Sequence, residues 1–381
     1  DLSDTTQKDR LTVSFGNLML SSRKVDIRKN GLPLFICRNA GINIEDVYYN
    51  ANLPGNFVNQ MDFGNVNSVH IEDYQMFLTE AKHYLAVEKI NWEKLKSGFL
   101  VENITVAPFS NPSNRLQANV PQIAISGMDL KRLLKESYYQ GGHILIDRPE
   151  INLKLAMSES KSPVSLDLDY LPVFLRQRFH GAKSDQFEIK NAILQIQKSM
   201  PGDSLMLSAD EFNLEIHQFE IDSTSKMVPE RFLFSHDLRI NGSYISAHLP
   251  GKNYFIHTDQ FSLSTLEKDI SFTGLYAGFN ANGAQVGSDR ARFTAQNIDV
   301  DDFNFHDFTQ NQTLKCQRFV IDNPKIFFIA FADDSIKEDT RLETRQFPFD
   351  TLLIKKLDIG DAIINQASIN LGKTDKDNLI F

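Results

Sequence analysis

The sequence predicts a mainly β protein: an elongated, curved antiparallel sheet built from repeated strand pairs, with two or three short helices. The first observation is that apolar and polar residues alternate over many short segments, which is the period of a half-buried strand. The second is that one alternating segment recurs roughly every 40 residues along the chain, which indicates a repeat architecture. The interval is irregular, which disfavours a propeller with uniform blades.

The first recurring segment has two alternating apolar positions, a polar gap and two further alternating apolar positions. Ile123, Ile125, Met128 and Leu130 illustrate it, and the step from Ile125 to Met128 is odd. In an unbroken strand an odd step moves side chains to the opposite face of the sheet. We therefore predict that each strand bends or bulges in its middle. Further copies lie at 85–92, 205–214, 254–263, 293–300 and 352–359, with a fainter one at 13–20.

A second recurring segment carries a proline at the predicted bend. The closest relative of the stretch 144–153 (ILIDRPEINL) is 319–328 (FVIDNPKIFF), with which it shares Ile, Asp, Pro and Ile at equivalent positions, and looser copies lie at 187–196 and 362–371. A proline cannot donate to the hydrogen-bond ladder, so Pro149 and Pro324 are tolerable only where the ladder is already interrupted.

Strands that all bend at the same level form a curved sheet, which we expect to be a trough. A β-sandwich with ordinary bulges is the alternative. A sheet of roughly 12 to 16 strands would be on the order of 60–75 Å long at about 4.8 Å per strand. Two or three short helices cannot cover such a sheet, so it either folds onto itself or keeps an apolar face open.

Helical spacing of apolar residues is rare in this chain. It predicts helices over 129–140, which ends at a Gly-Gly pair, and over 171–180, which has a proline in its first turn and a glycine after its end. A third helix is predicted over 72–83. The charged stretch 332–347 is predicted to be a long surface loop.

The strand rhythm divides the chain into three parts. Residues 1–156 form the N-terminal part of the β-repeat array, 157–186 a helical insertion or boundary, and 187–381 the C-terminal part of the array. The chain of 381 residues thus consists of about seven strand-pair units rather than separate globular domains.

Composition excludes several classes of protein. The net charge of −9 disfavours nucleic acid as a partner, because phosphate binding requires a basic surface. The two cysteines, Cys37 and Cys316, form neither a disulfide framework nor a zinc site. The longest apolar run, 326–332, is far shorter than the about 20 residues of a membrane-spanning helix.

The chain lacks the motifs of the common catalytic and cofactor sites. It contains no phosphate-binding glycine loop, no G-x-S-x-G elbow and no H-E-x-x-H. We therefore predict no catalytic residues, no metal and no cofactor. Two polar groups are weaker candidates, the first for a metal site and the second for a histidine cluster: Asp299, Asp301, Asp302, His306 and Asp307, and His217, His236 and His257.

The segment 321–326 (IDNPKI) resembles the "x-I-x-x-P-x-I-x-L" strands of the AsmA-like proteins of Gram-negative bacteria. The segment 357–364 (LDIGDAII) resembles the strand–glycine turn–strand unit of that family, and 295–328 resembles its longer strand–excursion–strand unit. The resemblance covers 85–381 in patches. It implies an elongated β-groove on the periplasmic side of the envelope, tethered to the inner membrane by a helix upstream of residue 1. It also implies a role in outer-membrane assembly or phospholipid transfer.

A continuous apolar trough would bind phospholipid or another acyl-chain ligand without any catalytic group. Exposing an acyl chain to water costs about 0.8 kcal/mol per CH₂. A chain of about 16 carbons would therefore cost on the order of 12 kcal/mol. The residues predicted to line the groove are Ile123, Ile125, Phe293, Phe319, Ile321, Ile326, Phe328, Leu352 and Ile354.

Two other functions remain open at this point. The first is a structural or cell-surface interaction module, a closed β-sandwich whose core would contain the same apolar residues. The second is a carbohydrate-active enzyme, which would require two carboxylates about 5–9.5 Å apart in a cleft.

Overall fold

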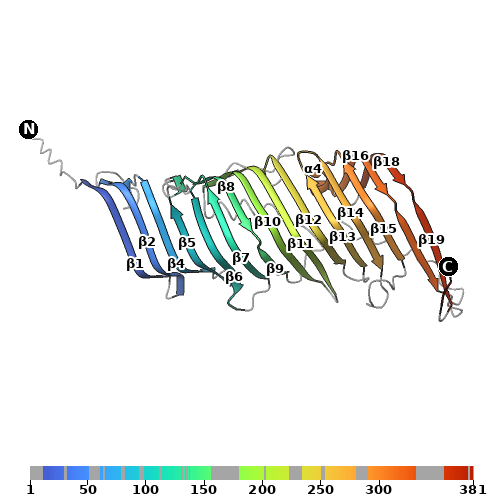
Figure 1. The fold of residues 1–381 in the computed structure, drawn as a ribbon, viewed down its shortest axis with the longest axis horizontal. Helices are drawn as coiled ribbons and strands as arrows, with labels where there is room; N and C mark the ends of the chain where they lie inside the picture. The colour runs from blue at the N-terminus through green and yellow to red at the C-terminus, as the bar shows by residue number, and fades with distance from the viewer. Residues whose placement is uncertain are drawn as a thin grey trace, which may run out of the picture.

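The protein forms one long sheet of 20 strands, in which the spatial order of the strands follows their order in the chain (Figure 1). The computed structural model describes residues 12–29, 32–50, 61–62, 65–78, 82–93, 98–110, 114–129, 132–133, 136, 138–155, 180–200, 203–222, 234–249, 254–279, 291–331, 356–375 and 378–380. The first and last strands lie at opposite ends of the long axis of the molecule. The predicted fold class, mainly β in an elongated curved sheet, is confirmed.

Most strands are long and cross the width of the sheet, alone or as two segments that follow one another. In the first half they are β1 (Thr12–Lys29), β2 (Leu32–Asn50), β3 (Met61–Asp62), β4 (Asn65–Leu78), β5 (His83–Glu93), β6 (Gly98–Pro108), β7 (Arg115–Ser126), β8 (Tyr138–Asp147), β9 (Glu150–Leu155) and β10 (Gly181–Met200). In the second half they are β11 (Asp203–Asp222), β12 (Asp237–Leu249), β13 (Tyr254–Ser264), β14 (Asp269–Phe279), β15 (Ala291–Asp301), β16 (Thr313–Asp322), β17 (Lys325–Phe331), β18 (Lys356–Asn365), β19 (Ser368–Asp375) and β20 (Asn378–Ile380).

The length of the sheet agrees with the prediction from the repeat. The two-residue β3 pairs with β2 and shares the position of β4, and the pairs β8/β9, β16/β17 and β18/β19 each occupy one position in the sheet; beyond β19 only the three-residue β20 pairs. Fifteen positions therefore follow one another, which at about 4.8 Å per strand gives a length of about 67 Å.

A row of residues with positive φ crosses the sheet where the sequence predicts the bends. Asn39, Asp73, Asn103, Asn191 and Tyr244 have φ between 48° and 53° in the middle of β2, β4, β6, β10 and β12. The left-handed conformation is costly for most L-residues and least so for Asn and Asp. In β5 and β6, Val87 faces Ile104 on one side of this interruption and Ile90 faces Val101 on the other. The odd apolar step is thus absorbed by the bend in these strands, as predicted. The prediction is wrong for Ile125 and Met128, because β7 ends at Ser126 and Gly127 has φ 65°.

The two proline segments form composite strands that turn through the same bend. Arg148 (φ 49°) links β8 to β9 and Asn323 (φ 51°) links β16 to β17, and the following Pro149 and Pro324 are buried. The prediction that each proline lies where the ladder is interrupted is confirmed.

The sheet is mixed rather than purely antiparallel, which corrects the prediction at two places. β10 runs parallel to β8/β9, and β18/β19 run parallel to β16/β17; we call these the first and the second parallel junction. Parallel neighbours need a connection of a dozen or more residues to return the chain to the same end of the sheet. The spacing in the chain allows this, because β9 ends at Leu155 and β10 begins at Gly181, and β17 ends at Phe331 and β18 begins at Lys356.

Of the three predicted helices, one is wrong, one is confirmed in part and one lies outside the described residues. Residues 72–78 belong to β4, because Tyr74 and Met76 alternate opposite Val87 and Leu85 of β5. Of the stretch 129–140, only residues 132–133 and 136 are described as helical, and β8 begins at Tyr138. Residues 171–179 lie outside the described residues, and His180 forms a bend.

One helix was not predicted. It is α4 (Phe305–Asn311), whose N-cap Asn304 accepts a hydrogen bond from the backbone N–H of Asp307 at 2.9 Å.

The predicted boundary at 157–186 does not interrupt the sheet. Residues 181–186 begin β10, which pairs with β8 and β11 on its two sides. All described strands belong to this one sheet, so a second sheet that would close a sandwich is not found among the described residues. The predicted loop 332–347 lies outside the described residues.

Candidate functional site

One face of the sheet is apolar from end to end, because the apolar residues of neighbouring strands stand directly opposite one another. Val101 of β6, for example, faces Ile90 of β5 and Ile123 of β7. Directly opposite side chains have Cβ atoms about 4.5–5.5 Å apart, close enough to contact. We call this surface the apolar face.

Two unbroken rows of apolar residues run along this face, one on each side of the bend. The first row is Ile71, Ile90, Val101, Ile123, Ile146, Ile189, Leu214, Ile240, Leu263, Ile270, Val300, Phe319 and Ala362. The second row is Leu116, Leu153, Ile196, Leu207, Ala247, Ile256, Ala277, Phe293, Ile326 and Ile369.

Burial along this face follows the shape of a trough. Residues beside the bend, such as Val87, Ile104, Ala192, Ala209 and Ala295, are buried. The members of the two rows are half-buried, apart from Val300, which is buried, and the exposed Ala362 and Ile369 at the last strands. The bend is therefore the floor of the trough and the two rows lie on its walls. A closed core would have buried both walls as well.

Six of the predicted groove residues lie on this face, and all six are half-buried: Ile123, Ile125, Phe293, Phe319, Ile321 and Ile326. They come from β7, β15, β16 and β17. Phe328 belongs to β17, where its backbone pairs with Ala291 and Leu371. Leu352 and Ile354 lie outside the described residues.

A cluster that includes α4 covers the apolar face near β15 and β16. Phe303 is buried, and its ring centroid lies 4.8 Å from that of Phe305 and 5.5 Å from that of Phe308. These rings pack with Ala295, Ile298, Val300 and Cys316. The close spacing of three phenylalanines was visible in the sequence, but the short helix that folds them back over the sheet was not predicted.

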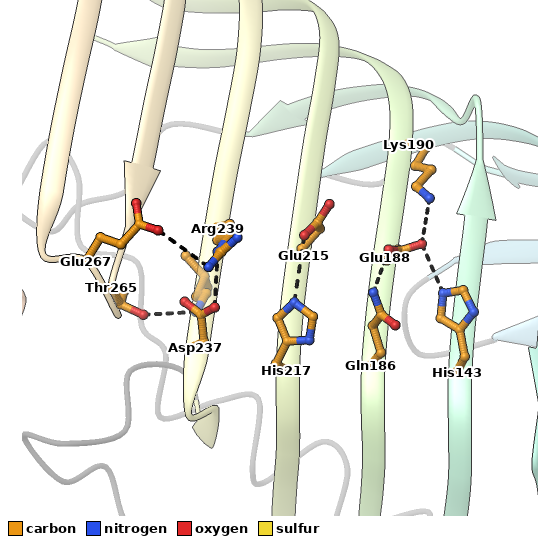
Figure 2. A network of polar contacts seen from close by, with 11 residues as sticks. His143, Gln186, Glu188, Lys190, Glu215, His217, Asp237, Arg239, Thr265 and Glu267 are labelled. Atoms are coloured by element: carbon orange, nitrogen blue, oxygen red, sulfur yellow. Dashed lines mark hydrogen bonds and ion pairs between the residues drawn. The ribbon is translucent and has the colours of Figure 1, made fainter.

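The other face of the sheet is polar, and a network of ionisable groups crosses β8, β10, β11 and β12 on it (Figure 2). Its centre is Glu188, a buried carboxylate that pairs with His143 at 3.0 Å and Lys190 at 2.9 Å and accepts a hydrogen bond from Gln186 at 2.6 Å. Burial opposes ionisation of Glu188, but the contacts with Lys190 and His143 outweigh it and lower the pKa of the carboxyl group.

The network continues on the next two strands (Figure 2). Glu215 of β11 stands directly opposite Glu188 and lies 3.7 Å from His217. On β12, Arg239 links the buried Asp237 at 3.1 Å to Glu267 at 3.6 Å. The sequence could not predict this burial, because strict alternation assigns these residues to a solvated face.

The candidate metal and histidine groups are not assembled. Asp301 pairs with Arg318 at 3.8 Å, Asp302 with Lys268 at 3.5 Å and Asp307 with Lys315 at 3.9 Å. Within the described ranges no group of His, Cys, Asp and Glu residues has the geometry of a metal site.

The three histidine side chains do not form one group, although the N–H of His236 donates to the His217 carbonyl at 3.1 Å. His217 pairs with Glu215 of its own strand, His257 of β13 pairs with Asp259, and His236 is exposed. The apolar face is therefore the candidate functional site of this chain.

No protein-family model and no curated protein matches the chain. Among the described residues, no helix has the length and apolar character needed to cross a membrane.

Proposed function

We propose that this chain is a non-enzymatic β-groove protein of the AsmA-like type, which binds or conducts lipid in the periplasm for outer-membrane assembly. The observation that carries the proposal is the pair of unbroken, half-buried apolar rows on one face of the sheet. Large contiguous apolar surfaces on soluble proteins mark binding sites. A cell-surface module with a closed sandwich would need a second sheet over this face.

The dimensions of the trough suit lipid acyl chains. The hydrocarbon core of a bilayer is about 30 Å thick, so the chains of one leaflet extend about 15 Å. The first row spans thirteen strand positions, about 58 Å at about 4.8 Å per strand, which accommodates several lipids one after another. From β4 to β13 the first row is unbroken and lies outside the α4 cluster, so a chain can move along it without crossing a polar barrier that would cost about 0.8 kcal/mol per exposed CH₂.

The proposal predicts that phospholipid co-purifies with the protein and appears in organic extracts by mass spectrometry. Leu207 of β11 is a half-buried member of the second row, whereas the adjacent Met206 points to the other face and is exposed. Leu207→Glu should reduce bound lipid several-fold, and Met206→Glu should not. Leu207→Trp, which fills the trough without adding charge, serves if the glutamate variant does not fold.

Two results would contradict the proposal. One is an extract of the wild-type protein without lipid, together with no uptake of a fluorescent fatty acid. The other is equal lipid in the Leu207 and Met206 variants, with circular dichroism showing that both retain the β fold.

A further inference from the structure

A shallow hollow of about 670 Å³ lies on the polar face of the sheet, opposite the trough, over β13, β14, β15 and the start of β17. This volume is within the usual range for small-molecule sites, about 300–1,000 Å³. Most of its lining lies on the face opposite the lipid site, because the side chains of Phe255, His257 and Tyr276 alternate with the trough residues Ile256 and Ala277. Leu275 and Ala295, beside the bend, also border the hollow.

Three aromatic rings gather along this hollow. The rings of Phe255 and His257 are parallel, with an interplanar angle of 5° and centroids 6.3 Å apart. Tyr276 of the neighbouring strand has its ring centroid 6.3 Å from that of Phe255. Aromatic side chains with a polar tip suit sites where one part of the ligand is apolar and another is hydrated.

Polar groups of several kinds surround these rings. The Asp259 carboxylate lies 3.2 Å from the His257 ring nitrogen Nε2. Lys325 of β17 also lines the hollow. The amides of Gln296 and Asn323 complete the rim. One carboxylate and one ammonium cancel, so the lining favours an uncharged ligand over a phosphate or a cation.

The backbone at the bend makes room for this arrangement. Gly274 has φ +65°, and a Cβ there would lie only 2.0 Å from Oδ2 of Asp259. The absence of a side chain at Gly274 therefore lets the Asp259 carboxylate lie across the floor of the hollow, where it can accept hydrogen bonds from a ligand.

We propose that this hollow binds a neutral glycan. A sugar ring has an apolar face of C–H groups, which would pack on the Phe255 and Tyr276 rings, and hydroxyl groups that both donate and accept hydrogen bonds. Asp259 would accept from these hydroxyls, Lys325 would donate to them, and the two amides can do both. The chain would then hold lipid on one face of its sheet and glycan on the other. This inference does not depend on the proposed lipid function.

The test is a titration of the whole chain with chitotriose, followed by saturation-transfer NMR. Binding with a dissociation constant on the order of 1 mM is expected. Tyr276→Ala should weaken it about tenfold, and Asp259→Asn, which keeps the shape of the side chain, should weaken it less. Tyr244→Ala is the matched control, since Tyr244 is an exposed tyrosine of β12 that does not line the hollow.

Several outcomes would overturn the inference. The first is the absence of saturation-transfer signals at a chitotriose concentration of about 10 mM, ten times the expected dissociation constant. The second is equal weakening of binding by the Tyr276 and Tyr244 variants. The third is binding of N-acetyltryptophan amide in place of the sugar. If Tyr276→Ala does not fold, Lys325→Gln replaces it in the titration, because the Lys325 side chain is exposed and is not needed for packing.

Discussion

The two parallel junctions have the same backbone but different surroundings. At the first, Arg148 N–H donates to the Lys190 carbonyl at 2.8 Å and Ile193 N–H to the Pro149 carbonyl at 2.9 Å. At the second, the equivalent bonds run from Asn323 to Asn365 and from Ser368 to Pro324, both at 2.9 Å. The bend and the pairing are therefore set locally, by a left-handed residue followed by proline.

The side chains at the two junctions differ because their neighbours differ. β10 is followed by β11 along its whole length, whereas β18 and β19 form the last described position and only the three residues of β20 pair beyond them. Glu188 is consequently buried, while Ile363, its equivalent by register, is 36% exposed. Burial of a strand residue thus depends on the adjacent strand as much as on its own sequence.

The largest effect on the free energy of unfolding is expected from isoleucines of the apolar face at the two junctions. Ile189 and Ile364 are equivalent, since they pair with Ile146 and Ile321, but only Ile189 also faces Leu214 on its other side. Ile189→Ala should lower the free energy of unfolding by about 2–3 kcal/mol. Ile364→Ala should lower it by less than about 1 kcal/mol, because Ile364 is 61% exposed. Urea unfolding measures both, and equal losses would refute the comparison.

The next effect concerns the ion network, which only the first junction has. Glu188→Gln should destabilise the protein by about 1–3 kcal/mol, because Lys190 and His143 lose their carboxylate partner. Ile363→Gln is the control at the second junction and should change the free energy of unfolding by no more than about 0.5 kcal/mol. A Glu188 variant as stable as the control would show that the network contributes no stability.

Acid should weaken the first junction. The pKa of Glu188 is lowered in the folded protein, so the ionised carboxylate contributes stability above its unfolded pKa, and this stability is lost as pH falls through the folded value. The unfolded value is that of an ordinary glutamate, about 4.3, so the loss occurs below about pH 4.3. The difference in unfolding free energy between wild type and Glu188→Gln should shrink in this range. A difference independent of pH down to the acid transition would disprove the assignment.

The opposite sign is expected beside the second junction. Burial raises the pKa of Asp299, and the carboxylates of Asp322 and Asp301 raise it further. Its ionised form is therefore destabilising at neutral pH, and protonation relieves the repulsion as pH falls through the raised folded value. Asp299→Asn should increase the free energy of unfolding at pH 7 by about 0.2–1 kcal/mol. Thermal unfolding at pH 7 tests this, and a lower melting temperature would contradict it.

The smallest effect separates the two left-handed residues. Asn adopts positive φ at little cost, whereas Arg does so at a cost of about 1 kcal/mol. Glycine relieves this strain in both variants but also adds conformational entropy to the unfolded chain. The free energy of unfolding should therefore be higher for Arg148→Gly than for Asn323→Gly, each relative to wild type, by about 0.5 kcal/mol. The exposed Arg148–Asp147 ion pair contributes little to this balance. Paired denaturation curves give the difference, and equal values would show that φ is not the determinant.

Some parts of the fold were predictable from local pattern and others were not. The odd apolar steps predicted the bends, because a side chain cannot change faces without a break in the strand. Residues 72–83 were predicted as a helix, because their spacing also fits a helical stripe and only pairing with β5 decides the matter. The parallel junctions were not foreseen, since the proline segments specify a bend but not the direction of the neighbouring strand.

The candidate site divides in the same way. Ile123, Ile125, Phe293 and Ile326 could be assigned to one apolar face because alternation alone orients them. The buried network around Glu188 and the hollow beside Gly274 could not be predicted, because each joins side chains of at least three strands.

By itself, the sequence determined which face of many strands is apolar and where the two proline segments bend, because both properties are local: alternation orients side chains, and proline is tolerated only where the ladder is interrupted. Only the tertiary structure decided which strands are neighbours, in which direction they run and how deeply each side chain is buried. These properties depend on contacts between segments distant in the chain. Alternating apolar residues are therefore half-buried on β8, at Ile144 and Ile146, and largely exposed on β19, at Ile369 and Leu371.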